Sequence, residues 1–132
     1  MKRLAGLSSA VLCSLAALTV AAVAADRTDR DARFFDARVA PILTRRCLGC
    51  HNEHLKNGGI SFLDRDSLLT GAFHGPVIVP GKPELGLMME VLRHDGEIQM
   101  PPGPKLPRKE IAILTEWIKR GAVWGSKLQR GK

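Results

Sequence analysis

The chain has 132 residues, a formal charge of +7 and only 5% aromatic residues. This length accommodates one domain and a short extra segment, so a second folded domain is excluded. The basic residues are scattered, without interleaved aromatic residues or a recognisable DNA-reading module, so nucleic-acid binding is not expected. A mildly positive surface instead suits an acidic partner protein or an anionic membrane face.

Residues 1–25 have the pattern of a secretory signal peptide. Two basic residues follow Met1, and residues 4–20 are apolar apart from small polar interruptions. Small residues then precede the charged Asp26, as at a cleavage site. We therefore expect export to the periplasm and no transmembrane span after cleavage. An uncleaved anchor is the alternative, although an alanine-rich segment is weakly hydrophobic for a permanent span.

Removal of this segment changes both the charge and the cysteine count. The segment carries Cys13, two of the 20 basic residues and none of the 13 acidic ones. The mature chain, residues 26–132, therefore has a formal charge of +5 and keeps only Cys47 and Cys50. A disulfide between these two would close a very small loop and constrain the unfolded chain little.

A helix is predicted just before the two cysteines. Residues 26–33 are charged and predict a frayed lead-in, and the apolar residues after them recur with helical spacing. Pro41 predicts either a kink or a new helix with proline in its first turn. The apolar stripe consists of Phe35, Val39, Ile42 and Leu43.

The sequence from Cys47 to Cys50 and His51 reads C-x-x-C-H. This spacing is typical of covalent attachment of one c-type haem, which uses both thiols as thioethers. His51 would then be the proximal ligand of the iron. The site would leave no cysteine of the mature chain unused.

Two other kinds of site use the same cysteines. A structural zinc site would need Cys47, Cys50 and two histidines, but zinc sites usually take their second ligand pair from some distance away. A thioredoxin-like redox dithiol would need a strand before the motif, and a helix is predicted there. The candidate histidines for zinc are His51, His54, His74 and His94.

Short, irregular elements are predicted after the motif. Residues 57–59 indicate a turn, and Asp66 or Ser67 is expected to cap a short helix that ends at Gly71. Residues 75–81 contain two prolines and two glycines and predict a constrained loop. A further helix is predicted from Pro83 towards His94, with Met88 and Met89 as packing residues.

Met100 is the candidate sixth ligand of the iron. Residues 98–104 contain three prolines, so they can form neither a helix nor a central strand. A thioether is a weak ligand, and a stiff loop holds it with little loss of entropy. His74 and His94 are alternative sixth ligands. An open sixth position would instead favour ligand binding or peroxide chemistry.

The last helix is predicted to begin at Pro107, with Glu110 in its first turn, and to end at Gly121. Residues 122–124 are expected to pack back onto the domain. Residues 125–132 predict a loose basic tail. The apolar residues of the helix are Ile111, Leu114, Trp117 and Ile118.

Together these motifs resemble a class I c-type cytochrome, and most closely the planctomycete-type cytochrome c domain. The resemblance extends over nearly the whole mature chain. It departs from the family where Pro107 stands in place of the usual Ser or Thr cap. The matching segments are Val39–Leu43, Arg46–Asn52, Lys56–Ser61, Gly75–Glu84, Arg93–His94, Met100–Pro102, Lys105–Leu106 and Glu110–Trp124.

The resemblance implies an all-α cytochrome c fold, in which the N-terminal and C-terminal helices pack around one covalently bound haem c. The domain core would cover about residues 33–125. Cys47 and Cys50 would attach the haem, and His51 and Met100 would ligate its iron. The function implied is single-electron transfer between redox partner proteins, without enzymatic activity. The competing functions are a haem peroxidase or gas-binding sensor, and a docked haem subunit of a larger redox enzyme.

Overall fold

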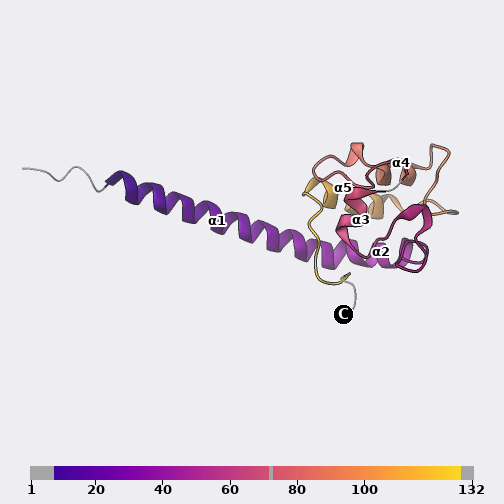
Figure 1. The fold of residues 1–132 in the computed structure, drawn as a ribbon, viewed down its shortest axis with the longest axis horizontal. Coiled ribbons are helices and arrows are strands. Elements are labelled where there is room, and N and C mark those ends of the chain that lie inside the picture. Colours follow the sequence, from indigo (N-terminus) through magenta and orange to yellow (C-terminus); the bar gives the residue numbers. More distant parts are fainter. Residues whose placement is uncertain (1–7, 72, 129–132) are drawn as a thin grey trace, which may run out of the picture. The chain divides into compact units, whose positions relative to one another are not determined.

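The structure is a computed structural model and describes residues 8–71 and 73–128. The chain divides into two compact units, residues 1–30 and residues 31–132. The described residues form helices without β-strands, which confirms the predicted all-α class. The elements are α1 (Ser8–Phe34), the π-helix η1 (Phe35–Val39), α2 (Ala40–Arg46), the 3-10 helix η2 (Asn57–Gly59), α3 (Arg65–Thr70), the 3-10 helix η3 (Pro83–Leu85), α4 (Leu87–Arg93) and α5 (Arg108–Lys119) (Figure 1).

The predicted frayed lead-in over residues 26–33 is wrong, because these residues continue α1. Asp26 and Arg30 pair at 3.2 Å with the i, i+4 spacing that supports a helix. Among the described residues, no helix is both long and apolar enough to cross a membrane. The predicted domain boundary at residue 25 stays a prediction.

Pro41 is accommodated by a local change of helix type. The backbone N–H of Ala40 donates to the carbonyl of Phe35, which is the wider π-helical pairing. Pro41, which has no N–H to donate, then lies in the first turn of α2. Of the two predicted alternatives, a kink and a new start, the structure shows the new start, one residue earlier than Pro41, at Ala40. The apolar stripe is also confirmed, since Phe35, Val39, Ile42 and Leu43 are all buried.

Three aromatic rings join the two ends of the domain. The ring centroid of Phe35 lies 5.6 Å from that of Trp117 and 4.4 Å from that of Trp124. Because Trp117 is on α5, this cluster packs η1 against the last helix. The indole N–H of Trp117 donates to the carbonyl of Val123 at 2.9 Å. The prediction that residues 122–124 pack back is confirmed.

The short helix α3 has a different cap from the predicted one. The Asp64 carboxylate accepts from the N–H of Ser67 at 2.8 Å, so the cap is neither Asp66 nor Ser67. Asp64 has the extended backbone that a capping residue needs, whereas the two predicted residues lie inside the helix. The predicted end at Gly71 is confirmed, with a left-handed φ of 69°.

The predicted continuous helix over residues 83–94 is also wrong, because the chain is extended at Gly86 between η3 and α4. A Cβ at Gly86 would lie 2.6 Å from the carbonyl oxygen of Val77. Because of this close approach, loop 75–81 accepts hydrogen bonds from the first turn of α4. The N–H of Met88 donates to the carbonyl of Val77 at 2.9 Å. Met88 and Met89 are buried, which confirms them as packing residues.

An ion pair joins α2 to α5 beside the cysteine motif. The guanidinium of Arg46 donates to both carboxylate oxygens of Glu110, at 3.0 and 3.4 Å. Arg45 adds a longer contact of 3.6 Å to the same carboxylate. The Glu110 side chain is only 17% exposed, so this pair is less screened by water than a typical surface pair. Glu110 therefore fixes the end of α2 against the first turn of α5, which has no side-chain cap.

The segment after residue 124 is held by Asp36 rather than loose. The Asp36 carboxylate accepts from the N–H of Lys127 at 2.9 Å and from the N–H and hydroxyl of Ser126 at 3.1 and 2.9 Å. Leu128 is buried. The predicted loose tail is therefore wrong up to residue 128, and residues 129–132 lie outside the described part of the chain.

We expect Glu110→Gln to lower the free energy of unfolding by about 1 kcal/mol, because the substitution removes the bidentate ion pair with Arg46 and a favourable negative charge at the N-terminus of α5. Urea unfolding of the full protein measures the change. The control is Glu116→Gln, which breaks an exposed pair with Arg120 inside α5 and should cost only about 0.3 kcal/mol. Equal losses in the two variants would contradict a special role for Glu110.

Asp36 should make stability depend on pH. Burial raises the pKa of the Asp36 carboxyl, but hydrogen bonds from Lys127 and Ser126 outweigh it and hold the pKa below its ordinary value of 3.8. A lowered pKa in the folded state stabilises the fold above the pKa of the unfolded chain, and the stabilisation is lost as the pH falls through the folded pKa. Asp36→Asn should therefore be about 1 kcal/mol less stable than the parent at pH 7. The difference should shrink below about pH 4, and a pH-independent difference would refute this linkage.

Candidate functional site

The cysteine motif forms a tight turn that continues α2. The backbone N–H groups of Cys47 and Leu48 donate to the Leu43 carbonyl at 2.9 and 3.0 Å. The N–H of His51 donates to the Cys47 carbonyl at 3.0 Å. These bonds bring both thiols and the imidazole onto one turn. Both thiols are free; Cys47 is half-buried and Cys50 is exposed.

The surroundings of Cys47 favour a neutral thiol. Burial, together with the negative charge of Glu110, raises the pKa of the Cys47 thiol to about 12. A redox-active cysteine requires the opposite shift, towards a thiolate near neutral pH. A helix also precedes the motif, where a thioredoxin-like site has a strand. The redox-dithiol interpretation therefore does not fit this site.

His51 lies against Phe62, with ring centroids 5.4 Å apart. Its backbone is fixed on both sides, since its carbonyl accepts from the N–H of Phe62 at 2.9 Å. The Nδ1 atom of the imidazole is buried and has no hydrogen-bond partner among the described residues. A buried polar atom without a partner is rare and costly, so it marks a place where the protein alone does not complete the site.

A haem-ligating histidine usually donates its second ring nitrogen to a backbone carbonyl, but in this structure no carbonyl of loop 75–81 accepts from His51 Nδ1. The loop uses its carbonyls elsewhere. Those of Pro76 and Val77 accept from the first N–H groups of α4, and that of Val79 accepts from the N–H of Lys82.

These residues fit a covalently attached haem. Two free thiols stand three positions apart on one turn, and the next residue is an imidazole with unused hydrogen-bonding capacity. In the described part of the chain, no three His, Cys, Asp or Glu side chains gather into a group that could hold a metal ion. The zinc interpretation therefore gains no support from the fold.

Met100 is half-buried in an irregular segment beside the end of α4. Its N–H donates to the carbonyl of Val91 at 3.0 Å. Its own carbonyl accepts from Nε2 of His94 at 2.8 Å. Within residues 8–71 and 73–128, no hydrogen bond or ring contact joins Met100 to His51, so their pairing across an iron stays a prediction.

The two alternative sixth ligands have different surroundings. His74 is exposed in the loop after α3, whereas His94 is half-buried and directs Nε2 at the Met100 carbonyl. The sequence does not predict the contact between His94 and Met100. The one signal for this contact in the sequence is that His94 stands directly before the turn residues Asp95 and Gly96.

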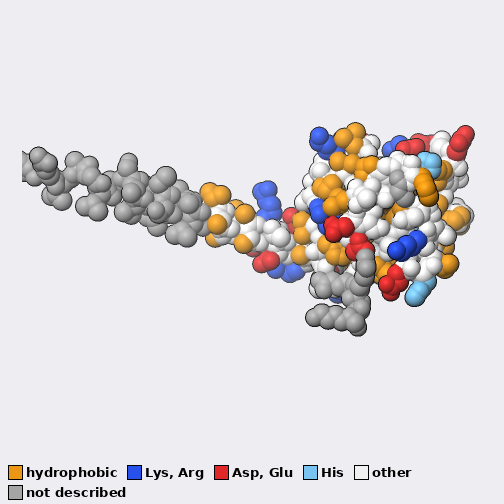
Figure 2. Space-filling model, viewed as in Figure 1, with side chains coloured by type: hydrophobic (Ala, Val, Ile, Leu, Met, Phe, Trp, Pro, Cys, Tyr) orange, Lys and Arg blue, Asp and Glu red, His pale blue; other side chains and the backbone are white. Residues whose placement is uncertain are grey.

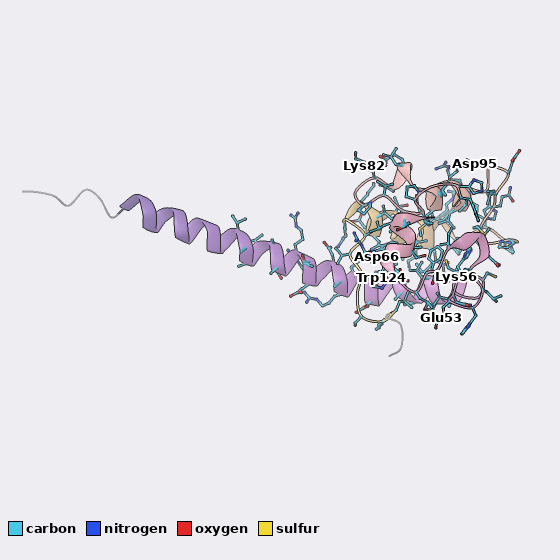
Figure 3. The ribbon with its side chains drawn as sticks, viewed as in Figure 1. Glu53, Lys56, Asp66, Lys82, Asp95 and Trp124 are labelled. Carbon is cyan, nitrogen blue, oxygen red and sulfur yellow. The ribbon has the colours of Figure 1, made fainter. Side chains whose placement is uncertain are left out.

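Haem propionates would need hydrogen-bond donors, and three of the candidate donors, Arg65, Arg93 and Trp117, already have partners. Arg65 donates to the carbonyls of Gly121 and Ala122, and the Trp117 indole donates to Val123. Arg93 pairs with Asp95 at 3.3 Å. Lys82 is exposed before η3 and points away from the domain (Figure 3).

A groove of about 490 Å³ lies between the end of α4, residues 105–106 and the start of α5. Three basic side chains and three apolar ones line it. Elsewhere on the face seen in Figure 2, basic and acidic side chains of the domain are interspersed. The lining residues are Arg93, Lys105, Leu106, Arg108, Ile111 and Ala112.

Comparison with known proteins agrees with the resemblance seen in the sequence. The family model of planctomycete cytochrome C matches residues 47–104, a segment that contains both thiols, His51 and Met100. A search of curated proteins and a search of solved structures each returned no match. The family implies covalently bound haem with iron and a c-type cytochrome that transfers electrons to and from redox partners. Over residues 47–104, the chain therefore matches the planctomycete cytochrome C family.

Proposed function

We propose that this protein is an exported electron carrier with one haem c, attached through Cys47 and Cys50 and ligated by His51 and Met100. The observation that carries the proposal is the single turn that presents two free thiols and an imidazole with an unpartnered nitrogen. The family match over the same turn supports it.

The chain supplies attachment and orientation. The continuation of α2 fixes both thiols and His51 on one turn, and Phe62 restrains the imidazole ring. The end of α4 holds Met100 through two hydrogen bonds: the Met100 N–H donates to the carbonyl of Val91, and the His94 side chain donates to the Met100 carbonyl. When bound, the haem iron supplies a one-electron couple whose potential depends on its axial ligands and on its burial.

Electron transfer requires no acid–base pair or nucleophile, and we propose no catalytic residue. The partner is expected to be a redox protein with an acidic docking surface. Arg93, Lys105 and Arg108 line the groove beside the Met100 segment, and the mature chain carries a net positive charge. Such docking should weaken as salt increases.

Export is proposed from the N-terminal sequence. A basic start, an apolar stretch and small residues before Asp26 form the pattern of a cleaved secretory signal. Cleavage after Ala25 would place the mature chain in the periplasm.

Mass spectrometry of the protein purified from a host that attaches c-type haem tests the attachment. We expect a chain that begins at Asp26 and carries the added mass of one haem. The double variant Cys47→Ala/Cys50→Ala should lose the haem mass completely, whereas Cys13→Ala should leave it unchanged because that residue lies in the predicted leader. A parent protein without added haem mass would refute the proposal.

The ferric absorption spectrum tests the sixth ligand. The parent protein should show the charge-transfer band of a methionine bound to iron, and Met100→Ala should abolish it and lower the reduction potential, since axial ligands tune haem potentials over about 0.8 V. Met88→Leu is the matched control, because it changes a buried packing methionine and should keep the band. A parent protein that lacks the band and binds CO rapidly when reduced would instead favour a gas-binding or peroxidase function.

A further inference from the structure

The residue that follows α4 has an unusual backbone. His94 has φ 57° and ψ 32°, in the left-handed region, directly after the helix ends at Arg93. Glycine usually takes this position because it has no side chain to clash. A left-handed non-glycine residue costs free energy and persists only where its surroundings require it. The structure therefore suggests that the imidazole contributes something that glycine would not.

The contacts of Met100 show what that contribution is. The N–H of Met100 donates at 3.0 Å to the carbonyl of Val91, one of the last four carbonyls of α4 and therefore without a partner inside the helix. The Met100 carbonyl lies 2.8 Å from Nε2 of His94. A carbonyl oxygen can only accept, so Nε2 carries the proton and donates it. The end of α4 thus binds the peptide groups on both sides of the Met100 Cα.

The segment around Met100 is fixed to the same helix end at two further points. The Gln99 side-chain amide donates to the carbonyls of His94 and Gly96, both at 3.3 Å. On the other side of Met100, the ammonium group of Lys105 donates to the carbonyl of Arg93. The C-terminal end of α4 is therefore the anchor of this segment, and the bond from His94 is the closest side-chain tether to Met100.

We propose that His94 is a positioning residue that holds the Met100 thioether in place for the iron. This inference rests on the proposed function, since it assumes that Met100 is the sixth ligand. A thioether binds haem iron weakly, so the fraction of time it stays bound depends on how firmly the chain holds it. Because Nε2 of His94 is committed to the Met100 carbonyl, His94 acts on the ligand rather than as the ligand.

The predicted consequence is a change in how easily Met100 is displaced. Imidazole competes with methionine for ferric haem iron, and its dissociation constant reports the strength of the methionine bond. His94→Gly removes the tether but keeps a residue that adopts the left-handed conformation without strain. We expect the variant to bind imidazole about tenfold more tightly than the parent, which corresponds to the loss of one hydrogen bond.

The matched control is His74→Gly, the same change at an exposed histidine outside the Met100 segment. It should leave the imidazole affinity unchanged. A merely structural role of His94 would alter the midpoint of urea unfolding without changing imidazole affinity under native conditions. An affinity of His94→Gly equal to that of the parent would overturn the inference.

A second measurement uses the unmodified holoprotein and so does not depend on the folding of a variant. In the reduced protein, the Nε2 proton of His94 should give a resolved, slowly exchanging NMR signal, because it is held in a hydrogen bond. The Nε2 proton of the exposed His74 should exchange too rapidly to be seen. Rapid exchange at His94 would also overturn the inference.

The experiment separates this inference from the proposed function. If the parent protein lacks the methionine–iron band, the ligation by Met100 is refuted whatever His94 does. If the parent has the band and the glycine variant resists imidazole equally well, only the role of His94 is refuted. A gain of about tenfold in imidazole affinity, confined to the His94 variant, supports both.

Discussion

The packing of the π-helical turn η1 against α5 is the contact on which the rest of the domain depends. Phe35 meets Trp117 and Trp124 there, and all three rings lie within 6 Å of one another, centroid to centroid. Aromatic groups bury the largest areas of any side chains, and the chain has few of them, so this cluster dominates the core. It fixes where α2 begins and therefore, after the seven residues of that helix, where the cysteine motif lies. The Glu110 ion pair then holds the other end of α2 to the same helix.

The candidate site joins two structural units that are far apart in sequence. One is the turn after α2, whose backbone hydrogen bonds to Leu43 and Cys47 place Cys47, Cys50 and His51 together. The other is the end of α4, which holds the Met100 segment through Val91 and His94. In both segments, backbone N–H groups donate to carbonyls at the C-terminal end of a helix. These carbonyls have no partner inside the helix, so the same hydrogen bonds satisfy them and fix the irregular segment. The chemistry proposed for the protein thus lies at two helix ends.

The elements that follow from local sequence were predicted well. The apolar stripe before the motif, the new helix start beside Pro41, the stop at Gly71 and the irregular proline-rich segment all depend on neighbouring residues and are confirmed. Two of the errors lie where a distant segment changes the local outcome. Gly86 breaks a predicted helix because the chain passes within contact distance of Val77, and Asp36 orders residues 126 and 127 from ninety positions away. Neither contact leaves a periodic pattern in the sequence.

The sequence by itself determined the spacing of Cys47, Cys50 and His51 on a single turn, which follows from local backbone geometry, and this spacing predicts the chemistry of attachment. It also identified Met100, since three nearby prolines restrict that segment wherever it lies in the fold. Only the tertiary structure decided which groups surround these residues: Glu110 beside Cys47, Phe62 against His51, and His94 on the carbonyl of Met100. Each of these is a contact between separate segments, formed only when the helices pack. The tertiary structure therefore shows which contacts hold the candidate ligands, and the sequence alone predicts which residues those ligands are.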